Sequence, residues 1–105
     1  MDVLLRIKRL ALQGRVRFTV KAKEEMKADN LEAIEVIESL VGAQSIAKTL
    51  RSRSGDRSYA GEKLYVIKSF SYDGTPIYTK GKIGREAGHE VFYVLISAKI
   101  EWGAA

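Results

Sequence analysis

Apolar positions along this chain follow two different periods, and the change of period divides the sequence into a helical part and a strand part. In the first part, Val3, Ile7 and Leu10 recur at the spacing of one helix face, which predicts a helix over residues 2–13. Gly14 stands where a helix C-terminal cap is expected. The segment "RVRFT" that follows is predicted to be a short extended connector.

Two further helices are predicted before residue 45. Thr19 can cap a helix over residues 20–28, and Asn30 can cap a third helix that continues to about residue 40. Gly42 would end this third helix. Its apolar stripe is expected to consist of Leu31, Ile34, Ile37, Leu40 and Val41, and its polar face of Glu32, Glu35 and Glu38.

From residue 45 the period changes to two, which predicts strands. Four of them are expected, within "QSIAKTLRS", "KLYVIKSF", "IYTKGKI" and "VFYVLISAKI". Asp73 and Gly74 indicate a tight reversal before the third strand, and "GREAGHE" is predicted to form a second turn. The last strand begins with six consecutive apolar residues, so it is expected to be central and covered on both faces.

This order of elements predicts an α+β fold in a single domain spanning residues 1–105. The amphipathic helices would pack on one face of a mostly antiparallel four-stranded sheet. The other face would be only partly covered, and a ligand is expected to lie there.

The charge distribution suggests what kind of ligand this would be. The net charge is +5, but residues 28–47 contain four acidic side chains and no Lys or Arg. Residues 48–85 contain nine Lys and Arg against three Asp and Glu, a net of +6. A polyanion is the natural partner of the second segment, although a merely solvated basic surface has the same composition.

The sequence also indicates a compartment. It contains no cysteine, which excludes a disulfide scaffold and a thiolate metal site. Arg6, Lys8 and Arg9 interrupt the apolar residues of the first segment, which is therefore not a secretory signal. No apolar run approaches the ~20 residues that span a bilayer. We expect a cytoplasmic protein with no membrane partner and no cofactor.

Several lysines occupy strand positions where apolar side chains are expected. Lys48 alternates with Ile46 and Leu50, which should point inward, and Lys99 occupies a similar position in the last strand. Either these are edge lysines that prevent aggregation between sheets, or they lie at the rim of a site. The residues expected on the same face as Lys99 are Tyr93, Leu95 and Ser97, and the third strand places Tyr78, Lys80 and Lys82 on one face.

Several other kinds of site are excluded by the sequence. His89 is the single histidine, so a two-histidine acid/base pair cannot form within one chain. In its predicted turn it is either a solvated residue or part of a site. No glycine-rich nucleotide-binding motif is present. The regularly spaced glutamates of the third helix form either a solvated face or a metal site, and no further ligands converge on them.

The remaining cations and phenols suit cleavage of RNA by its own 2′-hydroxyl. That reaction needs a proton removed from the 2′-hydroxyl, extra negative charge stabilised on phosphorus and a proton supplied to the 5′-oxygen. Preorganised Lys and Arg can stabilise the charge, and a Lys or Tyr whose pKa is lowered by neighbouring cations can transfer protons. DNA has no 2′-hydroxyl, so the activity would be specific for RNA and would need no metal.

The order of the motifs gives a more specific expectation. An amphipathic helix followed by "QGRVRFT", then "IAKTLRS", "IYTKGKI" and a terminal "VLISAK", resembles the MqsR family of type II toxin–antitoxin mRNA interferases and the related DUF4258 domains. These belong to the wider RelE-like RNase fold. The resemblance extends from about Val3 to Lys99 and implies an mRNA-cleaving toxin.

The resemblance also implies a set of catalytic residues. The first-strand motif of the family matches "IAKTL" and gives Lys48, its "YxK" motif gives Tyr78 and Lys80, and its terminal motif matches "ISAK" and gives Lys99. The family's glutamine has no counterpart here. Glu62, which lies near the expected position, could replace it as a proton acceptor.

Binding residues and partners complete the expectation. Arg51 and Arg53 would grip RNA phosphates, with Arg57 and Lys82 as further RNA-binding residues. The resemblance implies a cognate antitoxin encoded nearby, often with a zinc-binding end and a DNA-binding end. The alternative is a small module of the same fold that binds RNA or protein and has lost catalysis, as the missing glutamine would allow.

Overall fold

The computed structural model describes residues 2–51 and 62–103. Its first helix, α1 (Val3–Leu12), begins at Asp2, whose side chain accepts a hydrogen bond from the backbone N–H of Leu4 at 3.0 Å. Ile7, Leu10 and Ala11 form its buried face, and Gly14 follows its end with a φ of 71°. The predicted boundaries and apolar stripe of this helix are confirmed.

The second and third helices differ in how well their starts were predicted. Helix α2 (Val20–Ala28) begins after Thr19, whose hydroxyl accepts a hydrogen bond from the N–H of Ala22, as expected. Helix α3 (Ala33–Val41) instead begins after Glu32, which forms a capping box with Glu35. The prediction that Asn30 caps α3 is wrong, because this residue has a φ of 53° and lies in the turn that follows α2.

The later start of α3 also changes its buried face. Val36, Ser39 and Leu40 are buried, whereas Ile34 is 55% exposed. Leu31 is buried but precedes the helix. The predicted stripe was therefore partly wrong.

Within residues 2–51 and 62–103, five strands form one mixed sheet in the order β1-β5-β4-β3-β2. Strand β1 pairs with β5 in parallel, and the other neighbours are antiparallel. The α+β class is confirmed, but the prediction of four strands missed β1, because three residues are too few to show a period of two. The strands are β1 (Val16–Phe18), β2 (Lys48–Arg51), β3 (Lys63–Phe70), β4 (Pro76–Glu86) and β5 (His89–Ile100).

The last two strands are longer than predicted. Most of the expected turn "GREAGHE" belongs to them, and the chain reverses at Ala87 and Gly88, both of which have positive φ. His89 is the first residue of β5 and pairs with Glu86, so its predicted place in the turn is wrong. Strand β4, and not β5, is the middle strand of the sheet.

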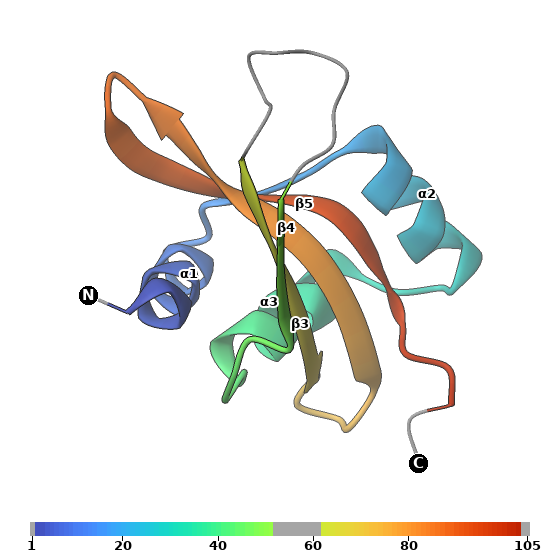
Figure 1. Ribbon diagram of the computed structural model, residues 1–105. Helices are drawn as coiled ribbons and strands as arrows, with labels where there is room; N and C mark the ends of the chain where they lie inside the picture. Colours follow the sequence, from blue (N-terminus) through green and yellow to red (C-terminus); the bar gives the residue numbers. More distant parts are fainter. Residues whose placement is uncertain (1, 52–61, 104–105) are drawn as a thin grey trace.

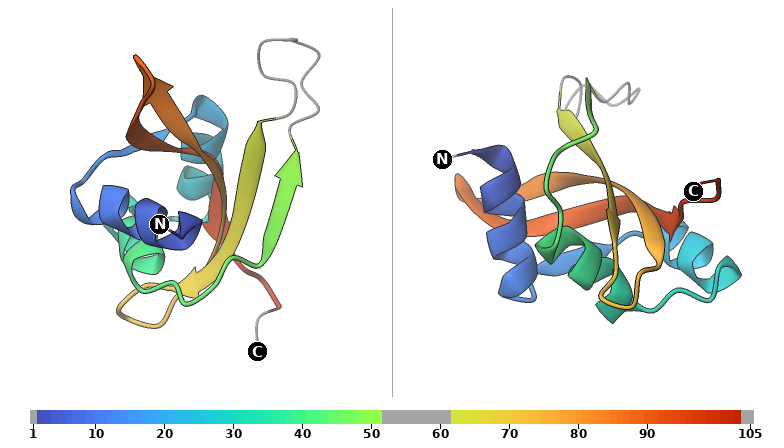
Figure 2. Two further views of the ribbon diagram at one scale, coloured as in Figure 1. Left: turned by 60° about the vertical axis from the view of Figure 1, so that its left-hand side comes forward. Right: turned by 90° about the horizontal axis from the view of Figure 1, so that it is seen from below.

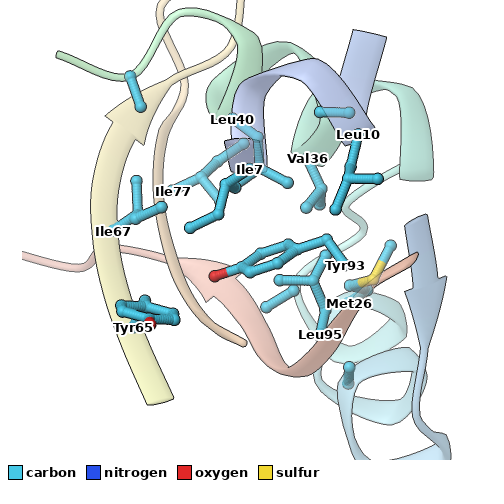
Figure 3. Close-up of a cluster of buried hydrophobic side chains, with 14 of the residues drawn as sticks. Ile7, Leu10, Met26, Val36, Leu40, Tyr65, Ile67, Ile77, Tyr93 and Leu95 are labelled. Atoms are coloured by element: carbon cyan, nitrogen blue, oxygen red, sulfur yellow. The ribbon is translucent and has the colours of Figure 1, made fainter. Parts of the chain in front are cut away.

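Helices α1, α2 and α3 lie on one side of the sheet, and no helix of the described residues covers the opposite side (Figures 1 and 2). The core between the helices and the sheet is built around the buried ring of Tyr93 (Figure 3). The expectation that β5 is covered on both faces is therefore wrong. We call the surface of the sheet opposite the helices the open face.

A β-bulge in β5 decides which residues reach the open face. Lys80 pairs with Ser97 and the next residue, Gly81, pairs with Leu95, so Ile96 has no partner on β4. The extra residue changes the alternation along the strand. Tyr93 and Leu95 face the core before the bulge, and Ala98 and Ile100 face it afterwards.

Because of the bulge, the prediction that Lys99 shares a face with Tyr93 and Leu95 is wrong. Lys99 is exposed and pairs with Tyr78, on the face opposite the buried pair Thr79 and Ala98. The error arose because strict alternation was assumed along the whole strand.

Candidate nucleic-acid interface

Two neighbouring rows of side chains cross the open face. In a sheet, directly paired residues point to the same side. Lys68 pairs with Tyr78, which pairs with Lys99, and this forms the first row across β3, β4 and β5. In the second row, Lys48 of β2 and Lys80 of β4 lie on either side of Val66.

Contacts within the first row bring a phenol and an ammonium group together. The Nζ atom of Lys99 lies 5.2 Å from the centroid of the Tyr78 ring, within the range of a cation–π interaction. On the other side of Tyr78, the Lys68 ammonium lies 3.5 Å from a carboxylate oxygen of Glu101. The phenol is thus placed between two lysines.

The open face is hollowed between β2 and β4. A depression of about 190 Å³ lies over Val66, which is buried although it is not part of the core cluster. Lys48 and Lys68 form part of its walls, and Tyr78 borders it on the side of β4. The expectation that Lys48 and Leu50 belong to an inward-pointing face is wrong, because every residue of the edge strand β2 is exposed.

The structure brings together the four catalytic candidates that carry an amine or a phenol. Lys48, Tyr78, Lys80 and Lys99 all belong to the two rows. Lys68 was not predicted as a site residue. Its alternation with Val66 and Phe70 in "KLYVIKSF" was the available signal, but nothing in the sequence says which face of that strand is open.

The remaining candidates that the structure describes lie outside the two rows. Glu62 immediately precedes β3 and is six residues from Lys68, roughly 20 Å along an extended chain. It accepts a hydrogen bond from Lys82 at 2.9 Å. Arg51 is exposed and alternates with Leu50, so it does not share the open face. Arg53 and Arg57 lie outside the described residues.

Large aromatic side chains are exposed at or just after the ends of β3 and β5. Phe70, at the end of β3, is 59% exposed, and Tyr72 in the following turn is 72% exposed. Trp102 is 75% exposed, close to the end of β5. Exposed aromatic rings next to lysines are typical of surfaces on which nucleobases stack.

Two of the described side chains, Asp73 and Tyr93, have clearly shifted pKa values, and neither belongs to the rows. Hydrogen bonds from the side chains of Ser71 and Thr75 lower the pKa of Asp73 in the turn before β4. Burial, with a smaller contribution from the neighbouring Tyr65, raises the pKa of the Tyr93 phenol in the core. These shifts concern the fold and not the open face.

The described part of the chain offers no obvious metal site. Within residues 2–51 and 62–103, no three His, Cys, Asp or Glu side chains converge as metal ligands would. The helices in these ranges are also too short to cross a lipid bilayer.

Comparison with known proteins adds no further constraint. No protein-family model, no curated protein and no solved structure matches the chain. The arrangement of side chains on the open face is therefore the basis for any assignment of function.

Proposed function

We propose that the protein is a metal-independent endoribonuclease that cleaves single-stranded mRNA on the open face of its sheet. The observation that carries the proposal is the pair of adjacent rows, which gather four lysines around the phenol of Tyr78. In the part of the chain that the structure describes, Glu101 is the carboxylate that pairs with one of these lysines, so positive charge is in excess there. Such a surface attracts the phosphates of RNA.

The proposed reaction is a transfer of the phosphodiester within the RNA. The 2′-oxygen attacks phosphorus as its proton is removed, and the bond from phosphorus to the 5′-oxygen breaks. That oxygen takes up a proton, so the products are a 2′,3′-cyclic phosphate and a 5′-hydroxyl, and no water is consumed.

Each side chain has a proposed role in this step. The ammonium groups of Lys80 and Lys99 stabilise the negative charge that develops on the phosphorane oxygens. Tyr78, which contacts Lys99, is the candidate for proton transfer. Lys48 and Lys68 hold the neighbouring phosphates from the walls of the depression.

The exposed aromatic rings suggest how the bases are held. Phe70 and Trp102 offer flat surfaces near the first row. Stacking on such rings tolerates any base, so it would fix the strand without strong sequence preference.

Incubation of the purified protein with a single-stranded RNA in EDTA tests the proposal. We expect RNA products ending in a 2′,3′-cyclic phosphate, and no cleavage of the matching DNA. Lys99→Ala and Tyr78→Phe should each slow cleavage by roughly 100-fold, the size of a lost general-acid or charge-stabilising group. Lys23→Ala removes an exposed lysine of α2 and should cleave at the unchanged rate.

Two results would contradict the proposal. One is RNA that stays intact at high protein concentration. The other is cleavage that Lys99→Ala leaves unchanged.

A toxin is the proposed biological role, with an adjacently encoded antitoxin as its partner. Induced expression should then arrest growth, and Lys48→Ala or Lys99→Ala should relieve the arrest while the domain stays folded. Harmless expression of the wild-type chain would argue against a toxin.

The exposed aromatic side chains also favour a second candidate, a module that binds RNA without cutting it. A gel distinguishes the two functions, because binding retards the RNA whereas catalysis shortens it. Binding would weaken as salt is added, since phosphate contacts release counterions.

A further inference from the structure

A second cavity lies at the other end of β4, where the sheet forks. Strands β3 and β4 are paired from Phe70 and Pro76 as far as Tyr65 and Gly81. Strand β4 then continues with β5 alone, and Figure 1 shows this hairpin projecting away from β3. The cavity between them has a volume of about 600 Å³, and we call it the fork cleft.

Four cations from three elements line the fork cleft. Arg6 comes from α1, Lys63 from the start of β3, and Lys82 and Arg85 from β4. Their spacing in the sequence gives no hint that they meet, because Arg6 is far from the others along the chain.

Carboxylates neutralise only part of this charge. Arg6 and Arg85 share one carboxylate oxygen of Glu90, at 2.8 and 3.1 Å. Lys82 lies 2.9 Å from a carboxylate oxygen of Glu62. Glu90 and Glu62 are the carboxylates that pair with these cations among residues 2–51 and 62–103, so the described part of the fork cleft has two positive charges in excess.

The excess charge is partly withdrawn from water. The side chains of Arg6 and Lys82 are 30% and 25% exposed, and that of Glu90 is 22% exposed. The Nε atom of Arg6 is buried and has no hydrogen-bond partner among the described residues. The guanidinium groups of Arg6 and Arg85, the first mostly buried and the second 57% exposed, share one carboxylate and can therefore accept a further anion.

We propose that the fork cleft binds a phosphate monoester, the terminal phosphate of a nucleotide or of a nucleic-acid strand. A monoester carries about −1.5 to −2 charges at neutral pH, which matches the excess of two, whereas a phosphodiester carries one. The volume exceeds that of a phosphate and lies within the range of small-molecule sites, so a nucleoside can accompany it.

The fork cleft is distinct from the rows of the open face but connected to them. Lys82 follows Lys80 by two residues on β4 and so points to the same side of the sheet. A strand lying across the open face could therefore place its terminal phosphate in the fork cleft. The site does not depend on cleavage, because binding of a monoester needs no 2′-hydroxyl.

Calorimetric titration with AMP and with adenosine tests the proposal. AMP should bind and adenosine should bind far more weakly. Arg85→Gln, at an exposed position, should weaken AMP binding roughly tenfold, the effect of losing one charged hydrogen bond. Glu90→Gln removes the shared carboxylate and should bind AMP more tightly, and Lys23→Gln should bind like the wild type.

A pair of short DNA strands, one with a 5′-phosphate and one with a 5′-hydroxyl, distinguishes the two sources of the monoester. Tighter binding of the phosphorylated strand than of AMP identifies a strand end, and the reverse identifies a free nucleotide. Because DNA cannot be cleaved through a 2′-hydroxyl, the result is independent of the proposed nuclease activity. Equal binding of AMP and adenosine, or loss of AMP binding in Lys99→Gln but not in Arg85→Gln, would overturn the proposal.

Discussion

At the scale of single residues, the close packing of Tyr93 against the backbone of β4 is central to this fold. The ring is fully buried, and its hydroxyl points toward the strand that carries Tyr65 and Ile67 (Figure 3). The ring reaches this position because Gly81 has no side chain. A Cβ atom at residue 81 would lie 2.7 Å from Cζ of Tyr93.

Gly81→Ala should therefore destabilise the protein by about 1–3 kcal/mol, the cost of overpacking a core. Gly84→Ala is a matched control on the same strand, because its Cβ would lie 3.3 Å from a methyl group of Val94. Urea denaturation of both variants gives the two free energies of unfolding. An equal loss in the two would show that the contact with Tyr93 is not what requires glycine.

Tyr93→Phe should keep or increase the free energy of unfolding at neutral pH. The hydroxyl is buried without a hydrogen-bond partner in the described part of the chain. Its removal therefore also removes a desolvation cost that no hydrogen bond offsets. Burial also raises the pKa of this phenol above its ordinary value. The unfolded chain thus loses this proton at about pH 10, while the folded protein retains it.

The sign of the pH dependence follows from this difference. Above about pH 10 the folded state binds more protons than the unfolded state, so the free energy of unfolding is unchanged by this group below that pH and falls as pH rises further. Denaturation between neutral and strongly alkaline pH should show a shallower decline in Tyr93→Phe than in the wild type. Parallel declines would refute the assignment.

At the scale of the elements, helix α2 completes the outer edge of β5. Strand β1 pairs with β5 only from Tyr93 to Leu95. Beyond it, the backbone N–H of Ala98 donates to Glu25 and that of Ile100 donates to Asp29, at 3.2 and 2.9 Å. Carboxylates of α2 thus replace a neighbouring strand, which leaves fewer unpaired groups at the sheet edge.

Glu25→Ala should cost about 2 kcal/mol of stability, because the carboxylate also accepts a hydrogen bond from the buried hydroxyl of Ser97 at 2.6 Å. Glu24→Ala is the control, since Glu24 is the exposed neighbour on the same helix. Thermal unfolding should separate the two variants by several degrees. A similar melting temperature for both would mean that water replaces Glu25 at this edge.

The elements also show what the sequence could predict. Helices α1 and α2 were located within a residue or two, and strand β3 at its exact bounds, whereas β2 is shorter than predicted and β4 and β5 are longer. Strand β1 was missed because its pairing partner is 77 positions away, from Val16 to Tyr93. No local pattern records such a contact.

The residues of the candidate site could likewise be predicted from the sequence, but their arrangement could not. The choice of Lys48, Tyr78, Lys80 and Lys99 came from a family resemblance and from lysines at unexpected strand positions. Their arrangement in two rows depends on strand order and register, which the sequence does not contain. The fork cleft was not foreseen, because it joins Arg6 to side chains that are more than 50 residues away.

At the scale of the whole molecule, the two faces of the sheet differ in what they contribute. The helices and one face of the sheet enclose the core, which leaves the other face free to carry charge (Figure 2). Strand β4 links the two proposed sites, with Tyr78 and Lys80 in the rows and Lys82 and Arg85 at the fork cleft. The middle strand of the sheet is therefore the element richest in candidate binding residues.

The bulge at Ile96 has a consequence for recognising related chains. Tyr93 and Lys99 are separated by an even number of positions yet face opposite sides of the sheet, which regular alternation forbids. A relative without the bulge would carry the equivalent lysine one residue earlier. Alignments of the last strand should therefore allow a gap of a single residue between the buried tyrosine and the exposed lysine, because an ungapped comparison would match the lysine with a core position.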